Sequence, residues 1–140
     1  PAGKDDKFYK KIFLDCSHHA EQSLNKLYSR CRNLENKLLN DKELKNKLGN
    51  KFDDYVYLVN HTYVEHISSL FGEILIKCLK NSFSMCKNNN ECINELKDGI
   101  KRMEETTNSS KNNVKELINK IKKIEKKYNL KSNINFYGGN

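Results

Sequence analysis

Two cysteines, Cys86 and Cys92, have five residues between them. A pair this close in sequence could bind a metal ion, act as a redox pair or form a disulfide. Zinc sites commonly place about two to four residues between paired cysteines and need four converging ligands. A thioredoxin-like redox pair needs C-x-x-C on a βαβ frame. Neither pattern occurs here. The spacing therefore favours a disulfide that closes a turn between two helices.

Three further cysteines fit the same interpretation. If the first two long helices are antiparallel, Cys16 and Cys78 lie at similar heights in apolar positions, and facing positions can meet the limit of about 7 Å between Cα atoms that a disulfide requires. Cys31 lies near the opposite end and is predicted to remain a free thiol. The alternative is that all five cysteines are reduced core residues of a cytosolic protein. Disulfides would place the protein outside the reducing cytosol.

The histidines do not form a recognisable catalytic or metal-binding pattern. His18 and His19 are adjacent and diverge on a helix, and His61 and His66 are five residues apart, unlike the pair in H-E-x-x-H. Cys16 and His18 do not face each other on a helix either. No G-x-S-x-G or phosphate-binding loop occurs. We therefore predict a protein that is not an enzyme and uses neither a cofactor nor a metal ion.

Apolar residues spaced by three or four predict three long helices that would hold these side chains. The helices are expected at about residues 5–39, 52–78 and 93–128. The stretch "YVYLVNHTYV" is rich in β-branched and aromatic residues, but the helical spacing continues through it, which excludes a strand. The third helix has the most regular stripe: Ile93, Leu96, Ile100, Met103, Thr107, Ser110, Val114, Leu117, Ile121, Ile124 and Tyr128.

These elements predict an all-α fold, an elongated antiparallel three-helix bundle with a short linker helix. In the linker, Asn40 is a candidate N-cap with Glu43 three residues on, and Gly49 lies where a C′ residue belongs. The alternative is a four-helix bundle in which the last long helix is broken near residues 107–112. The chain is expected to be one domain over residues 1–140, with residues 1–4 a disordered expression scar and residues 131–140 a flexible tail.

Two polar residues, Thr107 and Ser110, take inward positions in the stripe of the third helix, inside "TTNSSKNN". A hydroxyl in such a position loses packing, although it can bond back to a carbonyl of its own helix and bend it. Thr107 and Ser110 are therefore predicted to form a hinge, about which the C-terminal half of the chain could swing to meet a partner.

Positive charge is concentrated in that C-terminal half. The chain carries a net charge of +8, with 36% hydrophobic and 31% charged residues, and no apolar run approaches the roughly 20 residues that span a bilayer. Residues 111–131 contain two glutamates and eight lysines, which form the candidate basic interaction face: Lys111, Lys115, Lys120, Lys122, Lys123, Lys126, Lys127 and Lys131. One interpretation is that these lysines form a solvated surface that only maintains solubility. The other interpretation is that they attract an acidic protein, an anionic lipid or an anionic glycan.

Lysine outnumbers arginine 23 to 3, and asparagine occurs 20 times. In this composition the chain resembles small helical secreted, surface or exported proteins of malaria parasites (Plasmodium), although no family motif is matched and the tryptophans of the PHIST export family are missing. The resemblance implies a secreted protein or one at the parasite or host cell surface. Because "PAG" resembles an expression scar, an upstream leader peptide is compatible with this sequence.

Three functions remain open on the sequence. The first is a non-enzymatic interaction module that binds a host or parasite protein through helix faces. The second is a binder of anionic membranes or glycans in host-cell invasion or cell traversal, acting through the basic residues. The third is an intracellular scaffold with reduced cysteines. Nucleic acid is disfavoured, because arginine is scarce and no reader motif occurs. The oligomeric state is not indicated.

Overall fold

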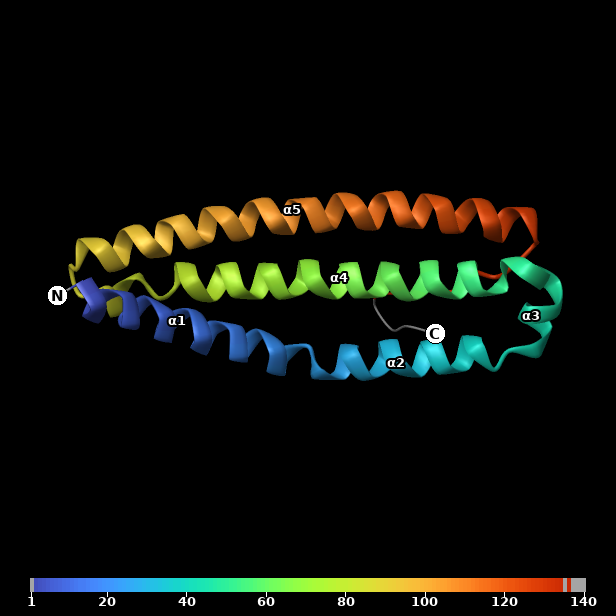
Figure 1. Ribbon diagram of the computed structural model, residues 1–140, viewed down its shortest axis with the longest axis horizontal. Helices are drawn as coiled ribbons and strands as arrows, with labels where there is room; N and C mark the ends of the chain where they lie inside the picture. The colour runs from blue at the N-terminus through green and yellow to red at the C-terminus, as the bar shows by residue number, and fades with distance from the viewer. Residues whose placement is uncertain (1, 135, 137–140) are drawn as a thin grey trace. The chain divides into compact units, whose positions relative to one another are not determined.

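The chain folds into helices, and no strand occurs in the part that the structure describes (Figure 1). The structure is a computed structural model that describes residues 2–134 and 136, with side chains from residue 8 onward. Its elements are α1 (Ala2–Ser23), α2 (Asn25–Leu39), α3 (Lys42–Leu48), the 3₁₀ turn η1 (Gly49–Lys51), α4 (Phe52–Lys80), the 3₁₀ turn η2 (Phe83–Cys86) and α5 (Asn90–Lys127). The predicted all-α helical bundle with a linker helix is confirmed.

The first predicted helix, residues 5–39, is wrong in one respect, because it is interrupted at Leu24. The Ser23 hydroxyl donates to the carbonyl of His19 at 2.8 Å, and the Leu24 N–H donates to the carbonyl of Glu21 at 3.2 Å. A back-bonded serine followed by a tightened turn ends α1. Helical spacing alone does not reveal the interruption, since Leu24 is buried like its neighbours in the stripe.

The N-cap of the linker helix α3 lies one residue later than predicted. Asp41, and not Asn40, is the N-cap, since its carboxylate accepts from the Leu44 N–H at 3.0 Å. The Asn40 side chain instead donates to the carbonyl of Asn36 at the end of α2. Gly49 ends α3 with φ of +55°, a conformation that glycine adopts without steric cost.

α4 covers the whole predicted range 52–78, and α5 covers the predicted range 93–128 except for its last residue. The alternative of a last helix broken near residues 107–112 is therefore wrong, because α5 is helical from Asn90 to Lys127. The turn between α4 and α5 places Lys87 and Asn88 at positive φ. The Asn89 side chain then accepts from the Cys92 N–H at 3.0 Å, which caps the first turn of α5.

The chain forms two compact units. Unit 1 comprises the residues up to Asn25 together with Ser68–Ser109, and unit 2 comprises Lys26–Ile67 together with the residues from Ser110 onward. α4 and α5 each contribute a segment to both units, so each unit packs one segment from each of the three predicted long helices. A single domain over residues 1–140 stays a prediction.

Unit 1 is a three-helix arrangement of α1, the end of α4 and the start of α5. Its core contains both disulfides, with Cys78 partly buried. The buried residues of this core are Ile12, Cys16, Leu75, Leu79, Cys86, Cys92, Leu96 and Ile100. Two helical glycines allow close approach around this core. Thr107 of α5 packs against Gly72 of α4, and the hydroxyl of Tyr9 in α1 lies against Gly99 of α5.

The first of these contacts makes a testable prediction. Gly72→Ala would remove a poor helix former, a gain of about 1 kcal/mol, but its Cβ would overlap the Thr107 Oγ1 atom. Since Thr107 is short and buried, we expect a net loss of about 1–2 kcal/mol of unfolding free energy, measured by urea denaturation. The double variant Gly72→Ala/Thr107→Ala should recover most of that loss. A stabilising Gly72→Ala would contradict the contact.

Unit 2 combines α2, α3, the start of α4 and the end of α5 around a second core. Its buried apolar residues include Leu38, Leu44, Leu48, Phe52, Tyr55, Val56, Val59, Tyr63, Ile67, Val114 and Ile121. α5 ends in a Schellman-type cap, in which Asn129 has φ of +54° and the Leu130 N–H donates to the carbonyl of Glu125 at 2.8 Å. This cap turns the chain back toward α4.

The segment after α5 was predicted to be a flexible tail from residue 131. In the described part of that segment, Asn133 bonds to groups of α4 and α5, and the Phe136 ring stacks on His66 with centroids 3.8 Å apart. Phe136 also meets Tyr63 edge-on at 5.2 Å. Residues 135 and 137–140 lie outside the described residues. At the other terminus, Ala2, Gly3 and Lys4 belong to α1, whereas Pro1 lies outside the described residues.

Candidate functional site

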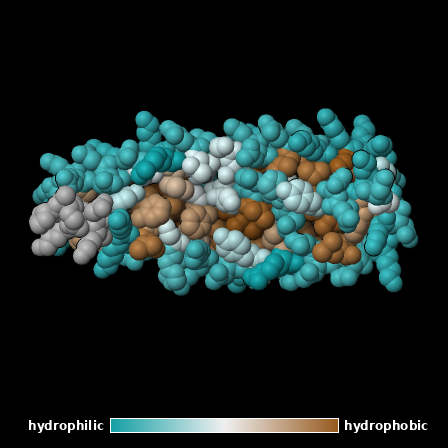
Figure 2. Space-filling model, viewed as in Figure 1, coloured by the Kyte–Doolittle hydropathy of each residue, from teal (hydrophilic) through white to brown (hydrophobic). Residues whose placement is uncertain are grey.

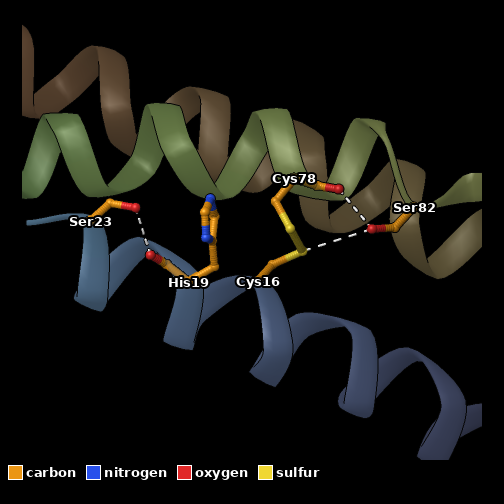
Figure 3. Close-up of a disulfide and its surroundings, with 5 residues drawn as sticks. All are labelled: Cys16, His19, Ser23, Cys78 and Ser82. Carbon is orange, nitrogen blue, oxygen red and sulfur yellow. Dashed lines mark hydrogen bonds between the residues drawn. A yellow bond between two sulfur atoms is a disulfide. The ribbon is translucent and has the colours of Figure 1, made fainter.

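The Cys16–Cys78 disulfide joins α1 to α4 within unit 1 (Figure 3). The two Cα atoms are 5.6 Å apart, well inside the range that a disulfide tolerates. Ser82, one turn after Cys78, donates to the Cys78 carbonyl at 2.7 Å, and its Oγ also lies 3.8 Å from the Cys16 sulfur. The predicted pairing of facing positions is confirmed.

The Cys86–Cys92 disulfide closes the turn between α4 and α5. Its Cα atoms are 5.5 Å apart across a sequence separation of 6 residues. Both cysteines are buried in the core of unit 1, at 3% and 1% exposure. The pair is therefore a structural disulfide that closes the turn, as predicted. Together the two disulfides fit an oxidising compartment.

Cys31 is the free thiol, as predicted, and it is buried in unit 2. Its sulfhydryl donates to the Asn60 side-chain oxygen at 3.5 Å. Burial raises the pKa of the Cys31 thiol, and the nearby charge of Glu35 raises it further. Because the thiolate is the reactive form, this cysteine is held in its inert state.

The thiol content gives a second prediction. Without reductant, native protein should react slowly with a thiol reagent such as Ellman's reagent, whereas the denatured chain should show one thiol and the reduced, denatured chain five. The native reaction should speed up only above the ordinary pKa of 9.0, because burial raises the pKa of the Cys31 thiol. Mass spectrometry after alkylation counts the thiols directly. Five alkylated cysteines in unreduced protein from its native source would contradict both disulfides and favour the intracellular scaffold.

The predicted hinge residues lie in a continuous helix. Thr107 is 4% exposed, and Ser110 is half-buried. Within the described residues, the Thr107 hydroxyl has no hydrogen-bond partner. The expected bond back to the helix is made instead by its neighbour Thr106, which donates to the carbonyl of Arg102 at 3.0 Å. Hinge motion itself stays a prediction, although units 1 and 2 divide between Ser109 and Ser110 on this helix.

The buried hydroxyl supplies a third prediction. Thr107→Val keeps the shape of the side chain and removes an unsatisfied polar group, so we expect about 1 kcal/mol of added stability. Thr106→Val is the matched control on the adjacent, exposed position, and it should change the unfolding free energy by less than about 0.5 kcal/mol. Both are measured by chemical denaturation. Destabilisation by Thr107→Val would show that the hydroxyl is satisfied in solution.

The eight lysines of the predicted basic interaction face are all exposed. Of the two glutamates in the same segment, Glu116 is exposed, but Glu125 is only 7% exposed. The surface of residues 111–131 therefore presents eight ammonium groups against one carboxylate, a stronger charge imbalance than the sequence count implied. Figure 2 shows hydrophilic side chains over most of the drawn face, with separate hydrophobic clusters between them.

Helical geometry divides the lysines of α5 into two stripes. At about 100° per residue, Lys111, Lys115, Lys122 and Lys126 fall within one sector of about 60°, which we call stripe A. Lys120, Lys123 and Lys127 fall in a second sector, which we call stripe B. Stripe B lies next to the half-buried Ile124 and Tyr128. The two stripes can therefore be tested separately by charge reversal.

A buried polar network explains why Glu125 faces inward. The Tyr55 hydroxyl donates to a Glu125 carboxylate oxygen at 2.7 Å, and the backbone N–H of Asn133 donates to the same oxygen at 3.2 Å. The Asn133 side chain donates to the Tyr55 hydroxyl oxygen at 2.9 Å. Burial raises the pKa of Tyr55, against the opposing effect of the Asn133 hydrogen bond. Sequence reasoning missed this network, although Glu125 lies four residues after the core residue Ile121 and so shares its face of the helix.

The histidines take no part in a metal-binding cluster. His18 and His19 are exposed on α1, His61 stacks on Tyr57 with ring centroids 5.7 Å apart, and His66 lies against Phe136. Within residues 2–134 and 136, no three His, Cys, Asp or Glu side chains gather as ligands for a metal ion.

Comparison of the chain with protein-family profiles, curated proteins and solved structures finds no match. In the part of the chain that the structure describes, no helix has the length and apolar character needed to cross a membrane.

Proposed function

We propose that this chain is a non-enzymatic interaction module of a secreted or surface protein, and that it binds an acidic protein partner through the basic half of α5. One observation carries the proposal: eight exposed lysines with one exposed carboxylate over residues 111–131. Such a surface attracts acidic partners over several ångströms and accelerates their association. The resemblance in composition to malaria-parasite proteins supports a partner on the host or the parasite.

The disulfides support the secreted or surface location. Bridges of this kind form and persist in oxidising environments and are rare in the cytosol. Both bridges lie in the core of unit 1, whereas the lysines of the basic interaction face belong to unit 2. The thiol count described above separates this location from the intracellular alternative.

The test is a binding screen against an array of extracellular protein domains with the fluorescent, disulfide-bonded protein. A binder should lose at least about tenfold in affinity when Lys122, Lys123, Lys126 and Lys127 are changed to glutamate. The matched control reverses four exposed lysines of unit 1, Lys77, Lys80, Lys97 and Lys101, with the same change in net charge. Equal losses in both variants would contradict a role for the α5 face.

A second candidate, binding to an anionic lipid or glycan surface, is favoured by the density of lysine along stripe A. Heparin and vesicles containing phosphatidylserine test it. Such binding would weaken steeply with added salt, because exposed charges are screened over about 8–10 Å at physiological ionic strength. Strong binding to heparin or vesicles together with no protein binder would favour this candidate over the first.

A further inference from the structure

An open groove lies on unit 2 between the start of α4 and the end of α5. Its volume is about 480 Å³, and its walls are Tyr57 and Leu58 from α4 and Ile124 and Tyr128 from the end of α5. Lys51 and Lys127 line it as well, with Asp54 as its acidic member. The volume falls in the range of about 300–1,000 Å³ that is typical of binding pockets.

The apolar walls of the groove present aromatic surface to solvent. Tyr57 is 66% exposed, although it is among the large hydrophobic residues of the chain, and its ring stacks on His61 at an interplanar angle of 15°. On the opposite wall, the Lys127 ammonium lies 5.5 Å from the centre of the Tyr128 ring. Aromatic rings that are already packed against a neighbouring side chain offer contact area to a ligand and lose little conformational entropy when the ligand binds.

The charges around the groove favour an anionic ligand. Lys51 and Lys127 outnumber Asp54 in its lining, and Lys120 and Lys123 of stripe B share the flank of α5 from which Lys127 enters it. A ligand complementary to this surface has an apolar part for the ring-lined walls and carboxylates for the flanking ammonium groups.

We infer that the groove is the docking site for an acidic peptide segment of the partner, in which one bulky apolar side chain is flanked by aspartates or glutamates. The apolar side chain enters between Tyr57 and Ile124, and the flanking carboxylates meet Lys51 and stripe B. A flat membrane surface would instead engage the exposed stripes of lysine without filling a concave groove. This inference rests on the proposed function and names the chemistry of its partner.

The experiment uses a fluorescein-labelled peptide of about 12 residues, with one phenylalanine between aspartates and glutamates, and measures its fluorescence anisotropy with the full chain. Lys127→Glu should weaken binding about tenfold, and Tyr57→Ser about fivefold. The matched controls are Lys37→Glu, at an exposed position of α2 in unit 2, and Val64→Ser, at an exposed apolar position on α4; neither residue lines the groove or belongs to the basic interaction face. Both should change binding by less than about twofold. Circular dichroism confirms that each variant is folded.

The outcomes separate this inference from the proposed function. Equal weakening by Lys37→Glu and Lys127→Glu, or equal binding of a peptide with alanine in place of phenylalanine, would show general charge attraction and overturn the groove as the site. No binding of the peptide would also overturn it, while the domain screen and its four-lysine variant decide the proposed function independently. Vesicle binding that requires Tyr57 and Lys127, without peptide binding, would identify a lipid headgroup as the occupant and overturn the peptide.

Discussion

Replacing Cys16 and Cys78 together with alanine is expected to lower the free energy of unfolding by about 4 kcal/mol. The bridge closes a loop with a sequence separation of 62 residues, so its removal releases a large conformational entropy in the unfolded chain. The measurement is equilibrium unfolding in guanidinium chloride without reductant, followed by circular dichroism. We expect the midpoint to shift to markedly lower denaturant concentration.

The second disulfide provides the matched control for this result. Replacing Cys86 and Cys92 with alanine removes a bridge with a sequence separation of only 6 residues and should cost about 2 kcal/mol. Both bridges lie in the core of unit 1, so the two variants differ chiefly in loop length. Similar losses in the two variants would contradict the loop-entropy argument and point to packing of the sulfur atoms as the main contribution.

Tyr55→Phe is expected to lower the free energy of unfolding by about 3 kcal/mol, a large effect for the loss of one oxygen atom. Tyr55 is fully buried, and its hydroxyl both donates to the Glu125 carboxylate and accepts from the Asn133 side chain. Without it, a buried carboxylate keeps only the Asn133 N–H among these partners. Hydrogen bonds to charged groups are worth about 1.5–3 kcal/mol, and a buried charge left short of partners adds to the loss.

The controls for this prediction use the same region of unit 2. Tyr63→Phe removes a bond to the neutral carbonyl of Asn133 and should cost only about 1 kcal/mol. Combining Tyr55→Phe with Glu125→Leu replaces both partners by apolar groups and should recover part of the loss. If the double variant is as unstable as the sum of the single variants, Tyr55 and Glu125 are not coupled.

The same tyrosine predicts a dependence of stability on alkaline pH. Burial raises the pKa of Tyr55 above its ordinary value of 10.0, the Asn133 hydrogen bond lowers it, and the hydrogen bond to Glu125 raises it again. Above about pH 10 the unfolded chain loses the proton while the folded protein retains it, so the unfolding free energy falls as the pH rises. This fall should be smaller in Tyr55→Phe than in the wild type, measured by denaturation between about pH 8 and pH 11.

Much of the scaffold could be predicted from local patterns. Spacing of three and four predicted the long helices, and the heights of the cysteines along them predicted both disulfides and the free Cys31. These predictions succeeded because a helix has a fixed rise and period, so sequence distance converts directly into position. The end of α1 and the cap of α3 were misplaced, since Ser23 and Asp41 act through single hydrogen bonds that periodicity does not encode.

The sequence by itself determined the helices, the pairing of the cysteines and the concentration of lysine after residue 110. Only the tertiary structure decided that Glu125 turns inward, that Thr107 packs on Gly72, and that a groove forms beside Tyr57 and Ile124. The physical reason is that each of these depends on which side chain of a second helix lies opposite. The helical period determines the face of the helix on which a residue lies. The side chains opposite that face determine whether a carboxylate or a hydroxyl finds a hydrogen-bond partner, and whether a groove remains between the helices.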